Sequence, residues 1–189
     1  TDQNGNGDFK YSVQSGFLAL CTDNLPNPSI DPNAGKTPDE YFNTVLYQGN
    51  SGTQSVTGVG FQPDFLWVKN RATAYSHALA DVVRGATKSV SSDSNAAERT
   101  SDITSLDSDG FSLQFVNATG SFSENQGSQN YVAWNWKAGG TAVSNTDGTV
   151  NSSVSANTEA GFSIVTFTGG ASGYTVGHGL SQAPEIVFT

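Results

Sequence analysis

Two stretches of this sequence, residues 41–69 and 161–189, carry the same order of apolar residues, glycines and proline. The matching positions are Phe42 and Phe162, Val45 and Val165, Tyr47 and Phe167, Gly49 and Gly169, Val56 and Val176, and Pro63 and Pro184. Self-similarity at one spacing indicates an array of like domains. The repeat therefore predicts tandem units, with one complete unit at residues 41–160 and the start of a second, truncated unit at residues 161–189.

Short apolar runs within the complete unit are bounded by Gly, Asn and Pro, which is typical of strands in a sheet. They predict strands at residues 43–47, 54–56, 65–69, 77–83, 111–116 and 131–137. Residues 89–99 and 141–157 are polar and predict surface connectors. Only 13% of the residues are charged, and helical periodicity is nearly absent. We expect an all-β chain that folds as an antiparallel β-sandwich of the jelly-roll type.

In two of the predicted strands, residues 111–116 and 131–137, large apolar residues occupy every second position, so these side chains should share one face. We expect the largest apolar side chains to form the core: Trp67, Phe111, Phe115, Trp134 and Trp136. Tyr131 and Asn135 lie on the other side of the same strand and are the candidates for lining a ligand-binding surface. The alternative is that Trp134 and Trp136 themselves form a sugar-binding platform, because sugars stack on aromatic faces.

The sequence before the complete unit has a different composition. Phe9–Val13 and Phe17–Cys21 predict two short strands, so we interpret residues 1–22 as the last strands of a preceding domain. Residues 23–40 contain four prolines and predict a linker, because proline lacks an amide hydrogen and fixes φ. Cys21 is the single cysteine, so the chain cannot form an internal disulfide.

The side-chain pattern argues against an enzyme. A glycosidase needs two carboxylates that face each other across a cleft, yet no Glu alternates with Asp inside a predicted strand. A serine nucleophile needs a histidine. The two histidines, His77 and His178, fall in different units, and Gly58 stands at the position that matches His178. We therefore predict a protein that is not an enzyme and that uses no cofactor.

Two sets of acidic residues are candidates for a metal site. One set imitates the start of a calcium loop: Asp2, Asn4, Asn6 and Gly7. Val13 stands where the closing acid of that loop would be. In the other set, Asp107 and Asp109 could offer two carboxylates to calcium, although Asp-Gly before an alternating strand is the usual hairpin signal. We expect turns at both places, with calcium as the alternative. One Cys and two distant His argue against zinc.

Charge narrows the classes of partner. The formal net charge is −9, whereas a nucleic-acid-binding protein would present a basic face. A lightly charged, acidic surface suits contact with neutral ligands such as sugars. The sequence has no apolar run of the length that membrane insertion requires. Nucleic acid and membrane are therefore excluded as predicted partners.

Several motifs in the same order resemble a known protein family. They are YFNTVLYQGN, GFQPDFLWVKNR, HALADVVRGATKSVSSDS, LDSDGFSL and YVAWNWKAGG. Together they look like a repeated domain of unknown function in tail-fibre-like or virion-surface structural proteins of marine bacteriophages. The preceding FKYSVQSGFLALCTDNLPNP looks like the end of a SPRY-like, lectin-type sandwich, and the closing GFSIVTFTGGASGYTVGHGLSQAPEIVFT resembles the start of a second related domain.

The resemblance implies a β-sandwich of the concanavalin or laminin-G type that is located on the virion, at the particle surface or in the tail. It implies a non-enzymatic structural protein, such as a tail fibre, surface fibre or decoration. The implied partners are other virion proteins, further copies of the chain in a homo-oligomer such as a trimer, and host-surface glycan. Two alternatives are open: a bacterial surface adhesin or extracellular filament subunit with tandem sandwiches, and a carbohydrate-active enzyme.

Overall fold

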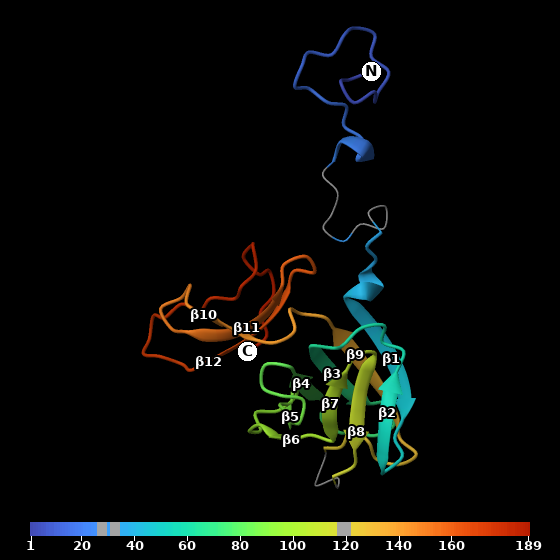
Figure 1. The fold of residues 1–189 in the computed structure, drawn as a ribbon, viewed down its shortest axis with the longest axis vertical. Helices are drawn as coiled ribbons and strands as arrows, with labels where there is room; N and C mark the ends of the chain where they lie inside the picture. The colour runs from blue at the N-terminus through green and yellow to red at the C-terminus, as the bar shows by residue number, and fades with distance from the viewer. Residues whose placement is uncertain (26–29, 31–34, 117–121) are drawn as a thin grey trace.

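The structure, a computed structural model, describes residues 1–25, 30, 35–116 and 122–189 (Figure 1). A four-stranded sheet has the order β1 (Phe42–Gln48), β9 (Asn130–Trp136), β3 (Phe65–Asn70) and β4 (Ala78–Asp81). A three-stranded sheet has the order β2 (Thr53–Thr57), β8 (Gly110–Gln114) and β7 (Ile103–Asp107). Neighbouring strands run antiparallel in both sheets. The prediction of an all-β, antiparallel chain is confirmed.

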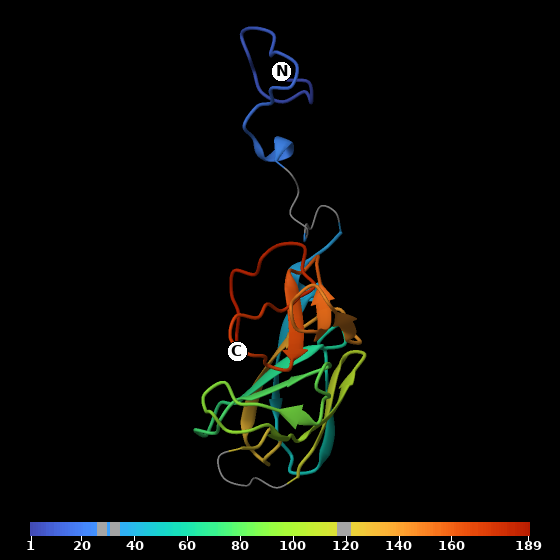
Figure 2. The same cartoon turned by 90° about the vertical axis from the view of Figure 1, so that its left-hand side faces the viewer.

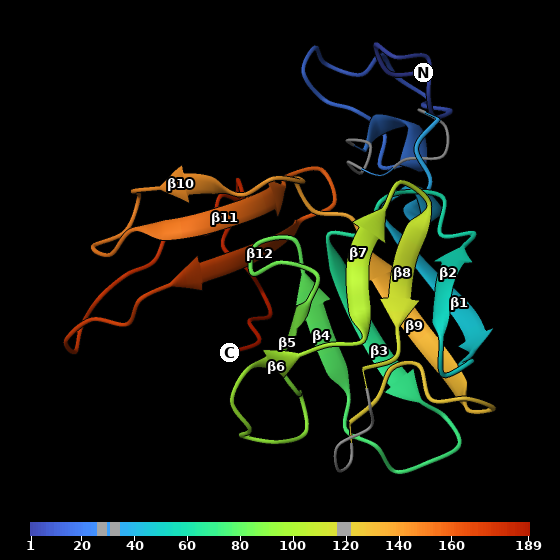
Figure 3. The same cartoon turned by 60° about the horizontal axis from the view of Figure 1, so that its bottom comes forward.

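The two sheets face each other and enclose the core, with β2, β8 and β7 in front of β1, β9 and β3 in Figure 3. Side chains from both inner faces meet there, as in a β-sandwich. The four-stranded sheet contributes Leu66, Val68, Ala78, Ala80, Tyr131 and Ala133, and the three-stranded sheet contributes Val56, Ile103, Phe111 and Leu113. β9 joins distant parts of the chain, because it pairs with β1 on one side and with β3 on the other.

The hairpin between β7 and β8 forms where the Asp-Gly signal predicts it. Asp107 pairs with Gly110, so Ser108 and Asp109 make the turn. Gly110 has a φ of 146°, and a Cβ atom at this position would lie 2.0 Å from the carbonyl oxygen of Val56. The close approach of β2 therefore requires glycine where the hairpin enters β8.

A third sheet consists of β10 (Val143–Asn145), β11 (Ser152–Asn157) and β12 (Phe162–Phe167). The prediction of a connector at residues 141–157 is wrong, because β10 and β11 lie within it. Their polar residues alternate with Val and Ala, and β12 supplies the partner strand that such a segment needs. The other predicted connector, residues 89–99, is mostly exposed and ends in a two-stranded sheet of β5 (Lys88–Ser89) and β6 (Arg99–Thr100).

The repeated stretch follows its earlier copy only in part. In the sequence match between the two copies, β12 corresponds to β1. Val176, which corresponds to Val56 of β2, forms a single bridge with Val150. Residues 185–189 form no strand, although they match β3. β3 lies between β9 and β4, whereas no strand of the described chain pairs with residues 185–189. The sheet of β10, β11 and β12 contains strands from both sides of residue 160, the predicted boundary between the units. The division of the chain into tandem units stays a prediction.

Residues 1–25 lie apart from the sheets (Figures 1 and 2). They contain one 3-10 turn, η1 (Thr22–Asn24), and no strand. The predicted strands at Phe9–Val13 and Phe17–Cys21 are therefore wrong, because no other segment of the described chain pairs with them to form a ladder. Part of the predicted linker, residues 26–29 and 31–34, lies outside the described residues. The remainder includes a second turn, η3 (Pro38–Glu40).

Candidate functional site

The outer face of the four-stranded sheet carries the large aromatic side chains. On β9, the buried side chains are Tyr131, Ala133 and Asn135, each 0% exposed. Trp134 and Trp136 point to the other side and are half-buried. Both expectations for this strand are thus reversed: Tyr131 and Asn135 lie in the core rather than on a surface. The tryptophans lie outside the sandwich core, and Trp67 on β3 is half-buried in the same way.

Hydrogen bonding and size explain why the polar side of β9 faces inward. The Tyr131 hydroxyl accepts a hydrogen bond from the Gln126 amide at 3.0 Å, and its ring stacks on Tyr47 at 5.0 Å between centroids. The Asn135 amide donates to the carbonyls of Asn43 and Ala133 at 3.0 and 3.1 Å. Polar groups that find partners cost less on burial, and of the Asn135 amide only the oxygen is buried without a partner in the described chain. The small Ala133 leaves room for Phe111 and Leu113 from the facing sheet. Those two residues are 0% exposed, whereas Phe115 is half-buried.

The first row of the outer face is apolar and is covered in part, since Phe42 at its edge is 39% exposed. Phe42, Trp136 and Phe65 stand opposite one another on β1, β9 and β3. Phe162 of β12 stacks on Trp136 at 6.1 Å and 19°, and it contacts the ring of Phe65 at 5.9 Å. The third sheet therefore joins the sandwich through an aromatic cluster at this end of the outer face.

The second row contains the other two tryptophans. Thr44, Trp134 and Trp67 stand opposite one another, and the two indoles meet edge to face at 6.0 Å and 75°. The Trp67 indole nitrogen donates to His77 Nδ1 at 2.7 Å. Burial lowers the pKa of His77, so the ring accepts this bond in its neutral form. The ring of Phe188 in the C-terminal segment meets the Trp67 indole edge to face, with 6.4 Å between the ring centroids. Figure 2 shows that segment (red) on the side of the molecule away from β7 and β8.

The outer face becomes polar toward the other end of the sheet. Leu46, Val132 and Lys69 form the third row, and Leu46 is 63% exposed. Gln48 and Asn130 follow as an exposed pair. All three tryptophans of the chain therefore stand on one face, beside a strip that runs from aromatic to polar side chains.

Two buried carboxylates of the sandwich, Asp102 and Glu124, hold a loop in place. Asp102 accepts hydrogen bonds from the amides of Val116, Glu124 and Asn125 and from the Ser123 hydroxyl, at 2.9 to 3.1 Å. Glu124 accepts from the Asp102 amide at 2.9 Å and forms an ion pair with Arg99. These bonds fix the segment before β9 against the start of β7. Sequence reasoning did not identify this pair, since the two acids lie in loops 22 residues apart.

The carboxylates proposed as calcium ligands at the β7–β8 hairpin are engaged by protein donors. Asp109 accepts from the amides of Gly58 and Gly60 at 3.1 and 2.6 Å, and these bonds lower its pKa. Asp107 accepts from the hydroxyls of Ser105 and Ser112 at 2.7 and 2.6 Å. Within the described residues, no three His, Cys, Asp or Glu side chains gather as a metal site would need.

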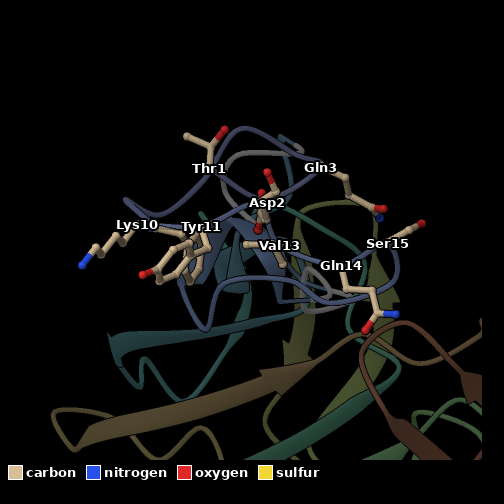
Figure 4. A pocket seen from close by; sticks show the side chains of 10 residues that line it. Thr1, Asp2, Gln3, Lys10, Tyr11, Val13, Gln14 and Ser15 are labelled. Carbon is tan, nitrogen blue, oxygen red and sulfur yellow. The ribbon is translucent and has the colours of Figure 1, made fainter.

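At the N-terminus, in the segment considered as a calcium loop, the Asp2 carboxylate binds protein donors, including the Asn24 side chain. Asp2 is 7% exposed and accepts from the amides of Asn4, Asn6 and Ala19 at 2.8 to 2.9 Å and from the Asn24 side chain at 2.7 Å. The Ala19 amide is the main cause that lowers the pKa of Asp2 to about 2. An open hollow of about 510 Å³ lies beside Asp2, and Figure 4 shows Tyr11 and Val13 among its lining side chains.

Together the sheets and the outer face define an all-β sandwich module whose aromatic residues are divided between the core and one outer sheet face. A family model described as a domain of unknown function, DUF7483, matches residues 37–189. The chain therefore belongs to the DUF7483 family. No curated protein and no solved structure matches the chain. No helix among the described residues is long and apolar enough to cross a membrane.

Proposed function

We propose that the chain is a non-enzymatic structural module of a virion, in a tail fibre, a surface fibre or a decoration protein, and that it makes outward contacts through its sandwich. The observation that carries the proposal is the outer sheet face with its three tryptophans. Large aromatic side chains that stay partly exposed outside a complete core are typical of surfaces that bind a partner. Other virion proteins and further copies of the chain, as in a trimer, are the expected structural partners.

The use of the acidic residues supports a non-enzymatic role. Catalytic carboxylates must present free oxygen atoms to a substrate in a cleft. The oxygens of Asp102 and Glu124 instead accept bonds from backbone amides, hydroxyls and Arg99. Asp64 is 3% exposed and accepts from the amides of Ala138 and Gly140. The buried carboxylates of the sandwich therefore stabilise loops rather than face a ligand.

The location is tested with antibodies raised against the purified chain. Gold-labelled antibody should decorate intact phage particles, at the tail or the particle surface, when particles are released from a host that carries this gene. Label confined to the bacterial cell envelope, with bare particles, would overturn the virion proposal in favour of the adhesin alternative. Light scattering on the purified chain gives the oligomeric state, for which we expect a homo-oligomer.

The enzymatic alternative is tested separately. The purified chain is incubated with polysaccharides extracted from the host surface, and new reducing ends are counted. We expect no increase over a heat-denatured sample. An increase that depends on the folded chain would show that the module is a carbohydrate-active enzyme.

A further inference from the structure

The outer face of the four-stranded sheet has one open region. Trp136 is stacked under Phe162, and Trp67 is contacted by His77 and Phe188. The aromatic contact of Trp134 within the described chain is the edge-to-face contact with Trp67. On its other side stand Thr44, which is exposed, and the next row with Leu46, which is 63% exposed. The broad face of the Trp134 indole is thus bordered by accessible side chains.

Hydrogen-bonding and cationic groups continue from this region along the sheet. Lys69 stands two residues from Trp67 on β3, and its ammonium group donates to the Tyr75 carbonyl at 2.6 Å. Arg71 follows β3, is exposed, and has its amide bonded to the Asn130 carbonyl at 2.7 Å. Gln48 and Asn130 stand exposed at the same end. We name this surface the open strip. It extends from Thr44 to Gln48 along β1, a length of about 13 Å at about 3.3 Å per residue, and it comprises Thr44, Leu46, Gln48, Asn130, Val132, Trp134, Lys69 and Arg71.

Charge indicates which class of ligand fits the open strip. The chain has a net charge of −9 and only eight Lys and Arg residues. Neither Lys69 nor Arg71 belongs to the ion pairs found among the described residues. Neither β1 nor β9 has an acidic residue among the four side chains that it places on the outer face. The charged side chains of the strip itself are therefore the two cations, while Asp93 lies beside it and accepts a hydrogen bond from the His77 amide at 3.3 Å. Two cations without an acid in the strip are complementary to an anionic ligand.

We propose that the open strip binds a carboxylated glycan, a polysaccharide that contains uronic acid residues. The apolar face of one sugar ring packs on Trp134, while sugar hydroxyls bond to Thr44, Gln48 and Asn130. Carboxylates of the glycan bond to Lys69 and Arg71, since charge-assisted bonds are the stronger ones. This inference deepens the proposed function, because it assigns the chemical class of the host-surface glycan, and it rests on that function for its biological setting.

The test uses the full chain and its own fluorescence. Because all three tryptophans lie on the outer face, a ligand on the open strip should change their emission. The probes are oligogalacturonate, oligomannuronate and hyaluronan, and the matched control is methyl-esterified oligogalacturonate, which has the same backbone without the charge. We expect saturable binding of at least one acidic probe, at least about tenfold tighter than the esterified control, and weaker at about 0.5 M salt than at about 0.05 M.

Variants locate the bound glycan. Trp134→Ala should weaken binding about tenfold or more, and Lys69→Gln should weaken the acidic probes while leaving the esterified control unchanged. Lys88→Gln is the matched control, because Lys88 is exposed on β5 and pairs with Glu98 away from the strip. Circular dichroism and thermal melting verify that each variant is folded. If Trp134→Ala does not fold, Lys69→Gln and Trp134→Phe carry the test.

Three outcomes would overturn the proposal. They are no saturable binding of any acidic probe at millimolar concentration, equal binding of the esterified control, and binding that Trp134→Ala and Lys69→Gln leave unchanged. None of these outcomes bears on the gold-labelling experiment, which tests the location on the particle. A chain that decorates virions but binds no acidic glycan would keep the proposed structural role and lose only the assignment of the ligand.

Discussion

Phe111 and Trp134 are both large aromatic side chains but have opposite positions in the sandwich. Phe111 on β8 is 0% exposed and contacts Tyr47 edge to face at 5.7 Å. Trp134 is half-buried on the outer face. Phe111→Ala should lower the free energy of unfolding by about 3–5 kcal/mol, because it leaves a cavity in the core. Trp134→Ala should cost less than Phe111→Ala, because Trp134 is partly open to solvent and its removal leaves no enclosed cavity.

Urea denaturation followed by circular dichroism measures both values. Leu113→Ala, another fully buried position of β8, serves as the reference for the cost of a core truncation. Equal losses for Phe111→Ala and Trp134→Ala would contradict the assignment of Trp134 to the outer face. Such a result would restore the expectation that the tryptophans form the core.

Asp2 gives a prediction about pH at the same scale. Its pKa is lowered to about 2 by hydrogen bonds, first of all from the Ala19 amide. A carboxyl with a lowered pKa in the folded state stabilises that state above its ordinary pKa, and the stabilisation is lost as pH falls. The fold of residues 1–25 should therefore loosen between about pH 4 and the folded pKa of about 2.

The amide NMR signals of Asn4, Asn6 and Ala19 should follow that transition together, with a midpoint near 2. Asp2→Asn should abolish the transition, while the signals of the sandwich core stay unchanged over the same range. A midpoint at the ordinary carboxyl value would show that the Asp2 carboxylate is not held by these amides.

At the scale of elements, Asp102 connects three segments that lie apart in the sequence. Its carboxylate joins Val116, two residues after β8, to the loop before β9, and its own amide donates to Glu124. Asp102→Ala leaves several donors without an acceptor at a site that is 5% exposed. We expect a loss of about 3 kcal/mol in the free energy of unfolding, the magnitude that a broken buried network produces.

Asp39→Ala is the matched control, because Asp39 is exposed in the turn η3. It should change stability by less than about 0.5 kcal/mol. Chemical denaturation of the two variants side by side gives the comparison. If Asp102→Ala proved as mild as Asp39→Ala, the loop before β9 would be held by other contacts.

At the scale of the whole molecule, residues 1–25 and the sandwich are structurally separate. The hydrogen bonds of residues 1–25 in the described chain stay within that segment. Lys36 makes a partly exposed ion pair with Glu159, and exposed pairs contribute little. Removal of residues 1–36 should therefore leave a folded chain whose Tm lies within about 2 °C of the full chain.

Differential scanning calorimetry of residues 37–189 and of the full chain checks this expectation. The retained part coincides with the match to the family. The complementary deletion, of residues 161–189, should lower Tm, because it removes β12 and the ring of Phe162 from Trp136. A Tm drop of more than about 5 °C on removal of residues 1–36 would show that the N-terminal segment supports the sandwich.

The sequence by itself determined the class of fold and most of the strands of the sandwich. The alternation in residues 111–116 and 131–137, the Asp-Gly turn before β8 and the scarcity of charge are local signals. A local signal suffices because the pleat sets a period of two and because glycine is needed where φ is positive or a neighbour approaches closely. The repeat predicted β12 for the same reason, since its first strand carries the same pattern as β1.

Only the tertiary structure decided which side of β9 is the inside. The alternation of β9 is the same whichever side faces the core. The size of Trp134 and Trp136 favoured the side that in fact faces outward. Partners from other segments decided the orientation. The Gln126 amide donates to Tyr131, the Asn43 carbonyl accepts from Asn135, and the ring of Tyr47 stacks on Tyr131. Partners likewise decided that residues 152–157 form a strand and that residues 185–189 do not. The aromatic outer face followed from the same choice, because strand pairing and burial depend on residues that are far apart in the chain.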